Sequence, residues 1–138
     1  MNALAVVLGL SGEMARLAGV SVAEVEQDRL GIARDFSAKY NVFLLLKGAR
    51  TVIASPDGEI AINGSGNPGM ASGGMGDVLT GVLAALIAQG YAPFAACKLG
   101  AFLHGLSADL VAAEKGEIGI SAVDVQERLP FAFKILSS

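Results

Sequence analysis

The sequence predicts an α/β fold with a partial sheet, an antiparallel hairpin at one edge and a helical carboxy-terminal flank. Short apolar runs typical of strands lie in the first half of the chain, and the second half holds only helical patterns. The chain has 138 residues, 53% of them hydrophobic and 17% charged. It is therefore expected to fold around a core as a single domain over 1–138.

Four apolar runs have the composition of strands, at residues 3–8, 42–46, 51–54 and 59–62. The first two are apolar throughout, as are strands buried inside a parallel sheet. The last two flank Pro56–Gly58, and Pro-Asp-Gly between strand-like runs predicts a hairpin turn. One edge of the sheet is therefore expected to be antiparallel.

Five helices are predicted, over residues 12–17, 21–39, 77–89, 93–115 and 121–129. Two of them begin with a capping box, in which a serine and an acidic residue three positions later cap each other's backbone N–H groups. These pairs are Ser21 with Glu24 and Ser121 with Asp124. Pro130 is expected to end the last helix, because proline has no N–H group to donate.

Charge and cysteine content exclude several classes of protein. The net charge is −3 and the basic residues are scattered, so no basic stripe is available for nucleic acid. The single cysteine, Cys97, allows no internal disulfide and fits a reducing compartment. The longest apolar run, Val78–Ala88, is shorter than the roughly 20 residues that cross a bilayer. We therefore expect a cytoplasmic protein without nucleic-acid or membrane partners, and its apolar composition favours a homo-oligomer.

The most informative segment is the glycine-rich stretch that ends at Asp77. Six glycines lie between residues 64 and 76, so this segment is predicted to be a loop directly before a helix. Backbone N–H groups at a helix start bind anions such as phosphate. A carboxylate beside them can accept a proton from a hydroxyl group that reacts at phosphorus. Asp77 would also be a good N-cap, and the residues alone leave capping and catalysis both open.

A second candidate segment, Lys47–Thr51, follows the predicted strand over 42–46. A residue directly after a buried strand emerges at the carboxyl edge of the sheet, where ligands bind in open α/β folds. Lys47 can therefore contact a nucleotide phosphate or ribose, or it can be an ordinary turn residue.

Other polar residues receive structural interpretations. His104, the only histidine, is expected to be packed within its helix, and Cys97 is expected to be a small core residue. Asp109 and Glu114 are expected on the solvated side of the same helix. Met75 can line a nucleotide pocket or fill a gap in the core. No set of metal ligands is visible.

The run Asn67–Gly81 resembles the defining motif of the ADP/ATP-dependent NAD(P)H-hydrate dehydratases, a family of the ribokinase-like superfamily. Lys47–Thr51 resembles the nucleotide-binding segment of that family. Gly12–Leu17 resembles a stretch that follows a Thr-Pro-His-Pro run. The resemblance covers nearly the whole chain and implies a three-layer α/β/α fold, of which this chain would be the carboxy-terminal, truncated part.

The resemblance also implies an activity, the repair of NADH and NADPH that have been hydrated on the nicotinamide ring. ADP or ATP would donate a phosphoryl group, and Mg²⁺ would accompany the nucleotide. Asp77 would contact the hydrated cofactor and act as the base. The residues that would contact the AMP part of the nucleotide are Lys47, Gly48, Ala49, Arg50, Thr51 and Gly76. The residues whose N–H groups would form the anion hole are Gly73, Gly74, Met75 and Gly76.

One position departs from the family pattern. Leu10 stands where the Thr-Pro-His-Pro run has its histidine, so that contact with the substrate is missing. Two alternative functions remain open from the residues. One is a small-molecule kinase of the same superfamily, which would leave the phosphate on its product. The other is a non-catalytic nucleotide-binding fragment.

Overall fold

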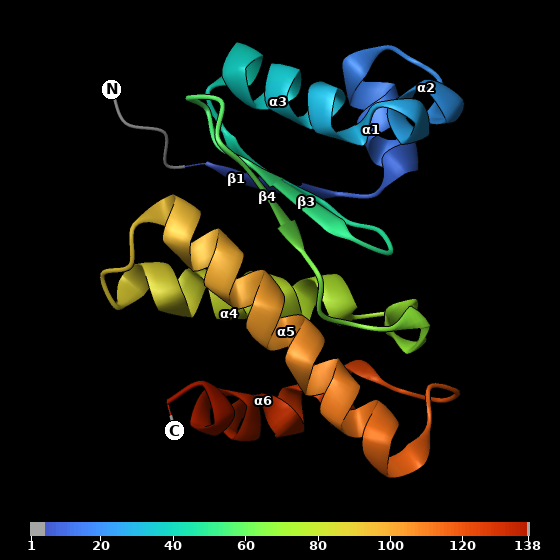
Figure 1. Cartoon of the computed structure of the whole chain (residues 1–138), viewed down its shortest axis with the longest axis vertical. Coiled ribbons are helices and arrows are strands. Elements are labelled where there is room, and N and C mark those ends of the chain that lie inside the picture. Colours follow the sequence, from blue (N-terminus) through green and yellow to red (C-terminus); the bar gives the residue numbers. More distant parts are fainter. Residues whose placement is uncertain (1–4, 138) are drawn as a thin grey trace. The chain divides into compact units, whose positions relative to one another are not determined.

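The computed structural model describes residues 5–137. They fall into two compact units that divide between Asn63 and Gly64. The elements of each unit are labelled in Figure 1. The prediction of one domain over 1–138 stays a prediction.

The first unit contains a four-stranded sheet with the order β1-β2-β3-β4. The strands are β1 (Val6–Gly9), β2 (Phe43–Leu46), β3 (Thr51–Ala54) and β4 (Ile60–Asn63). β1 and β2 are parallel, whereas β3 is antiparallel to both β2 and β4. The predicted hairpin edge is thus confirmed, and its turn is closed by the N–H group of Ser55, which donates to the Glu59 carbonyl at 2.9 Å. Residues 3 and 4 of the first predicted strand lie outside the described residues.

Three helices cover one face of this sheet (Figure 1). They are α1 (Ser11–Ala18), α2 (Val22–Gln27) and α3 (Arg29–Tyr40). The core between helices and sheet consists of Met14, Ala15, Val25, Ala33, Leu44, Leu46, Val52 and Ala54. The even-numbered residues of β2 and β3 therefore face the helices, as the alternation of side chains along a strand requires.

The helix predicted over 21–39 is two helices in the structure, so that prediction was wrong in its length. Its capping box is present, because Ser21 accepts from the Glu24 N–H group at 3.1 Å and Glu24 accepts from the Ser21 N–H group at 3.2 Å. The break is at Asp28, whose backbone leaves the helical region at φ −145° and ψ 61°. The Asp28 carboxylate accepts from the N–H group of Gly31 at 3.0 Å, so it caps a second helix.

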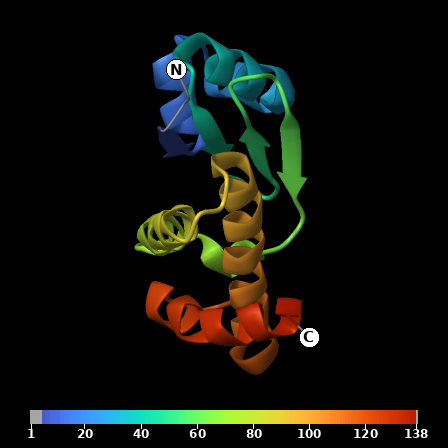
Figure 2. The same ribbon diagram turned by 90° about the vertical axis from the view of Figure 1, so that its left-hand side faces the viewer.

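The second unit consists of a short 3-10 turn, η1 (Pro68–Met70), and the helices α4 (Met75–Ala88), α5 (Pro93–Lys115) and α6 (Ala122–Ser137). In Figure 2 the long α5 crosses α6 steeply, and its start follows the turn after α4. One core cluster of this unit contains Met75, Ala108, Val111, Ile120 and Val125. A second contains Val82, Leu86 and Ala96. By length and mean hydropathy α5 could cross a membrane, but 56% of its most apolar window is buried, as in a core helix.

Two helix ends in this unit differ from the prediction. α4 begins at Met75 rather than at Asp77, because Gly74 is its N-cap with a left-handed φ of 86°. α6 does not stop before Pro130 but continues to Ser137. Burial of Val125 and Ala132, on either side of the proline, favours a continuous helix over the loss of one backbone hydrogen bond.

Candidate functional site

The glycine-rich segment leads into the start of α4 and places N–H groups there without partners in the helix. Met75, Gly76 and Asp77 are the first three residues of α4, and the N–H groups of a first helical turn have no intrahelical acceptor. The helix dipole adds partial positive charge at the same end. Two members of the predicted anion hole, Met75 and Gly76, therefore lie within the helix rather than in the loop before it.

Met75 has a structural role as well. Its side chain is buried and packs against Ala108, Val111 and Val125. The sequence left open whether the Met75 side chain lines a nucleotide pocket or fills the core. In the structure it fills the core. Its backbone N–H group still belongs to the first turn of α4.

Asp77 lies in the first turn of α4 and is exposed. Because Gly74 holds the N-cap position, Asp77 is the third helical residue and not the N-cap. Within residues 5–137 its carboxylate forms no hydrogen bond or ion pair. It also lines a groove of about 440 Å³ between α4 and α6, whose other walls include the apolar side chains of Val82, Leu129 and Phe133. The carboxylate is therefore open to a ligand.

The first half of the glycine-rich segment is attached to α5. The hydroxyl of Ser65 donates to the Phe102 carbonyl at 3.0 Å. The Asp109 carboxylate accepts from the Gly66 N–H group at 3.0 Å and from the Asn67 side-chain amide at 2.9 Å. Asp109 was predicted to be solvated, and that prediction was wrong. Its partners lie more than forty positions away along the chain, beyond the reach of helical periodicity.

The second predicted segment, Lys47–Thr51, leaves the carboxyl edge of the sheet as expected. Lys47 directly follows β2, and its N–H group donates to the Gly9 carbonyl at the end of the parallel strand β1. Gly9 pairs with Leu46, so Leu10 and Lys47 leave the sheet at the same edge. The position that departs from the family pattern is thus a neighbour of the candidate nucleotide segment in the fold.

Arg29 is a residue that the sequence reasoning missed. Its guanidinium donates from Nη2 to the Leu46 carbonyl at 2.9 Å and from Nη1 to the Arg50 carbonyl at 2.7 Å. The side chain is only 17% exposed. One guanidinium therefore joins the two ends of the turn that contains Lys47, Gly48 and Ala49.

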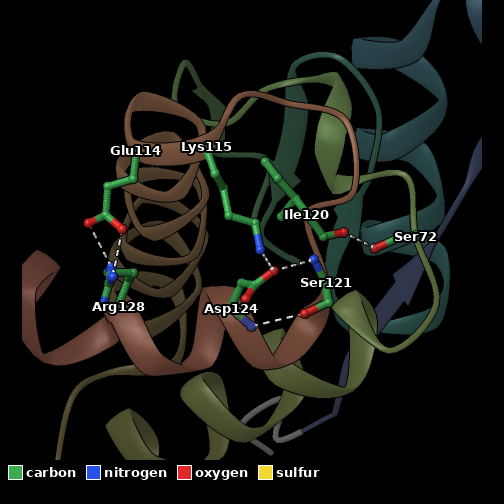
Figure 3. A network of polar contacts seen from close by, with 7 residues as sticks. All are labelled: Ser72, Glu114, Lys115, Ile120, Ser121, Asp124 and Arg128. Atoms are coloured by element: carbon green, nitrogen blue, oxygen red, sulfur yellow. Dashed lines mark hydrogen bonds and ion pairs between the residues drawn. The ribbon is translucent and has the colours of Figure 1, made fainter.

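A polar network holds the α5–α6 connection beside the glycine-rich segment (Figure 3). The Ser72 hydroxyl donates to the Ile120 carbonyl at 3.2 Å. The next residue, Ser121, begins a capping box, since its N–H group donates to Asp124 at 2.9 Å and its hydroxyl accepts from the Asp124 N–H group at 3.2 Å. The Ser121 N–H group, with further help from Lys115, lowers the pKa of Asp124 from 3.8 to about 2.

Two ion pairs in Figure 3 join α5 to α6, and the first is between Lys115 and Asp124, whose Nζ and Oδ2 atoms are 2.9 Å apart. In the second, Arg128 donates to both carboxylate oxygens of Glu114, at 2.9 and 2.6 Å. This hydrogen-bonded pair lowers the pKa of Glu114. Glu114 is exposed, as predicted for the solvated side of α5.

The remaining candidates have structural surroundings. His104 and Cys97 are buried in α5, as predicted. Burial raises the pKa of the Cys97 thiol to about 11, which keeps it in the unreactive protonated form. Among residues 5–137, no three His, Cys, Asp or Glu side chains are placed to hold a metal ion.

The family model described as NAD(P)H-hydrate dehydratase matches residues 8–130, which include the glycine-rich segment and Lys47–Thr51. The chain belongs to this family. A bifunctional NAD(P)H-hydrate repair enzyme of Moorella thermoacetica is 50% identical over 125 residues, which cover 91% of this chain and 24% of that protein. An ADP-dependent (S)-NAD(P)H-hydrate dehydratase of Neisseria meningitidis is 46% identical over 110 residues, which cover 80% of this chain and 36% of that protein.

Solved structures of the dehydratase family and its superfamily share the fold. The ADP/ATP-dependent NAD(P)H-hydrate dehydratase of Bacillus subtilis, co-crystallized with ATP/Mg²⁺, matches with a TM-score of 0.91 and 33% identity over 94% of this chain and 47% of that one. A ribokinase-like superfamily protein of Enterococcus faecalis matches with a TM-score of 0.75 and 32% identity over 94% of this chain and 44% of that one. The predicted ribokinase-like α/β class is confirmed. The chain spans less than half the length of each of these relatives.

Proposed function

We propose that the protein containing this chain dehydrates hydrated NADH and NADPH to the intact cofactors, with ADP or ATP as the phosphoryl donor. The observation that carries the proposal is Asp77, an exposed carboxylate without partners among residues 5–137. It lies in the first turn of a helix, where N–H groups can bind an anion. Family membership supports the choice of substrate, since the named relatives act on NAD(P)H-hydrate.

The nucleotide would be held by Lys47–Thr51 and by the backbone of Gly76. The turn after β2 supports this role, because its backbone is held at both ends by Arg29. A turn with a fixed backbone loses little conformational entropy when a ligand binds to it. The Bacillus subtilis relative was crystallised with ATP and Mg²⁺, and we include Mg²⁺ with the nucleotide in the proposal.

The reaction would proceed by phosphoryl transfer followed by elimination. Asp77 would take the proton from the ring hydroxyl while the hydroxyl oxygen bonds to the terminal phosphorus and the bond from phosphorus to the leaving nucleotide breaks. N–H groups of Gly73 to Gly76 would stabilise the charge on the transferred group. The phosphate would then leave with the C–O electron pair, and loss of a proton from the adjacent ring carbon would restore the dihydronicotinamide.

The test is incubation of the full-length protein with hydrated NADH and either ADP or ATP. We expect NADH fluorescence to return together with an equimolar release of phosphate. Accumulation of a phosphorylated product without NADH would instead identify a kinase. Thermal stabilisation by nucleotides with no turnover would identify a non-catalytic nucleotide-binding protein. Either of the last two results would refute the dehydratase proposal.

A further inference from the structure

The glycine-rich segment has a fixed half and an open half. The fixed half, Gly64–Ser72, is joined to the rest of its unit by the hydrogen bonds of Ser65, Gly66, Asn67 and Ser72. The open half is Gly73 and Gly74. A Cβ atom added at Gly73 would meet nothing within 4 Å, whereas one added at Gly74 would lie 3.1 Å from the Cβ atom of Ala122. The open half therefore joins two held segments, the fixed half before it and the start of α4 after it, where the side chain of Met75 is buried.

Asp109 makes a charged contact to this fixed half. Its two carboxylate oxygens accept from two neighbouring residues. Oδ2 accepts from the N–H group of Gly66, and Oδ1 accepts from the side-chain amide of Asn67. Asn67 in turn accepts from the N–H group of Gly69 at 3.0 Å and so begins η1. A single carboxylate thereby determines the orientation of Asn67 and the start of the following turn.

The shape of α5 shows that the loop backbone lies directly against the helix. A Cβ atom added at Gly105 would lie 2.8 Å from the backbone nitrogen of Gly66 and 2.7 Å from the carbonyl carbon of Ser65. These distances are shorter than real Cβ contacts, so α5 must have glycine at this position for the loop to lie there. Asp109 is one helical turn further along α5, where a side chain can reach the same stretch of loop.

We propose that Asp109 is a positioning residue for the phosphoryl-transfer step. By holding Gly66 and Asn67 on α5, it fixes the path along which Gly73 and Gly74 reach the start of α4. The N–H groups of that turn then face the transferring phosphoryl group beside Asp77. The inference rests on the proposed function. It adds a residue that does not touch the substrate and that acts through the backbone of the loop.

The hydrogen-bond pattern allows a reciprocal test. In Asp109→Asn, two side-chain amides face each other, so one donor loses its acceptor. In Asn67→Asp, two carboxylates face each other and repel. In the double variant N67D/D109N the amide of residue 109 can accept from Gly66 and donate to the new carboxylate at residue 67, which can still accept from Gly69. The double variant therefore restores every bond with the partners exchanged.

The experiment measures hydrated-NADH turnover by the full-length protein, with Glu114→Gln as the control on the same helix. We expect D109N and N67D each to lower kcat about 10- to 100-fold with the KM for nucleotide within about threefold, because catalysis depends steeply on placement. N67D/D109N should recover most of kcat, and E114Q should match the wild type. An unchanged kcat in D109N would overturn the inference. So would a loss that equals the unfolded fraction measured by circular dichroism, or a folded double variant without recovery.

Amide hydrogen exchange separates this inference from the proposed function. We expect faster exchange at Gly66–Gly76 in D109N than in the wild type, and wild-type exchange in N67D/D109N. If the wild type repairs no hydrated NADH, the proposed function fails, and the exchange pattern still decides whether Asp109 holds the loop. Wild-type exchange in D109N would overturn the positioning role.

Discussion

A Cβ atom added at Gly48 would lie 2.7 Å from Nη2 of Arg29, the nitrogen that donates to the Leu46 carbonyl. A side chain at residue 48 would therefore occupy the space that the guanidinium of Arg29 fills on the turn after β2. The turn keeps its shape because the guanidinium binds Leu46 and Arg50 together. A planar fork with several donors can do this, whereas an ammonium group offers only one point of attachment.

Arg29→Lys is expected to lower the free energy of unfolding by about 2 kcal/mol, because at least one charge-assisted hydrogen bond to a partly buried carbonyl is lost. Thermal stabilisation by ADP or ATP should fall as well, since the turn is no longer held at both ends. Urea denaturation and a nucleotide thermal-shift series measure the two effects. Arg34→Lys, at an exposed position of the same helix, is the matched control and should change neither. Equal behaviour of the two variants would contradict the role of Arg29.

Asp77→Asn is expected to lower kcat for hydrated NADH by about a hundredfold or more, because the amide cannot accept the proton of the ring hydroxyl. The variant should fold, since Asp77 is exposed and makes no bond within residues 5–137. Steady-state turnover and nucleotide thermal shifts should therefore separate, with turnover lost and binding kept. Asp35→Asn replaces an exposed carboxylate on α3 and should keep full turnover. Full turnover in the Asp77 variant would rule out its role as the base.

Leu10→Ser is expected to raise the free energy of unfolding by about 1 kcal/mol. Leu10 is the N-cap of α1, with an extended backbone at φ −93° and ψ 167°. Its side chain is 52% exposed, so little burial is lost on substitution. A serine hydroxyl at this position can accept a hydrogen bond from an N–H group of the first turn, and a leucine side chain cannot. Leu10→Ala is the control, because it removes the same apolar surface without adding an acceptor. No difference between the two variants in urea denaturation would contradict this explanation.

The stability of the second unit depends on pH because of Asp124. Its folded pKa of about 2 lies below the ordinary 3.8, so its contribution is fully present above about pH 4. That contribution is lost as the pH falls through about 2, where the carboxylate is protonated in the folded protein as well. The urea midpoint of the wild type should therefore fall from pH 4 to pH 2 more than that of Asp124→Asn. Equal slopes for the two proteins would contradict the assignment. Asp35→Asn, at an exposed carboxylate without a partner among residues 5–137, should keep the wild-type slope.

Local signals in the sequence were sufficient for most elements and for the candidate loop. The capping boxes at Ser21 and Ser121 and the Pro-Asp-Gly turn depend on residues close together in the chain, so spacing alone identified them. Contacts between distant segments were missed. Asp109 is 43 positions from Gly66, and Arg29 is 21 positions from Arg50. Neither pair has a spacing that any single helix or strand imposes, and only the fold brings the partners together.

Pro130→Ala is expected to raise the free energy of unfolding by about 1 to 3 kcal/mol. Pro130 lies inside α6, where it has no N–H group for the carbonyl one turn earlier and its ring crowds that turn. The gain is reduced by the greater freedom that alanine gives the unfolded chain. Pro93→Ala is the matched control, because Pro93 occupies the first turn of α5, where proline costs little. Urea denaturation should therefore show a higher midpoint than the wild type for Pro130→Ala and an unchanged midpoint for Pro93→Ala. A lower midpoint for Pro130→Ala would mean that the proline stabilises α6 where it lies.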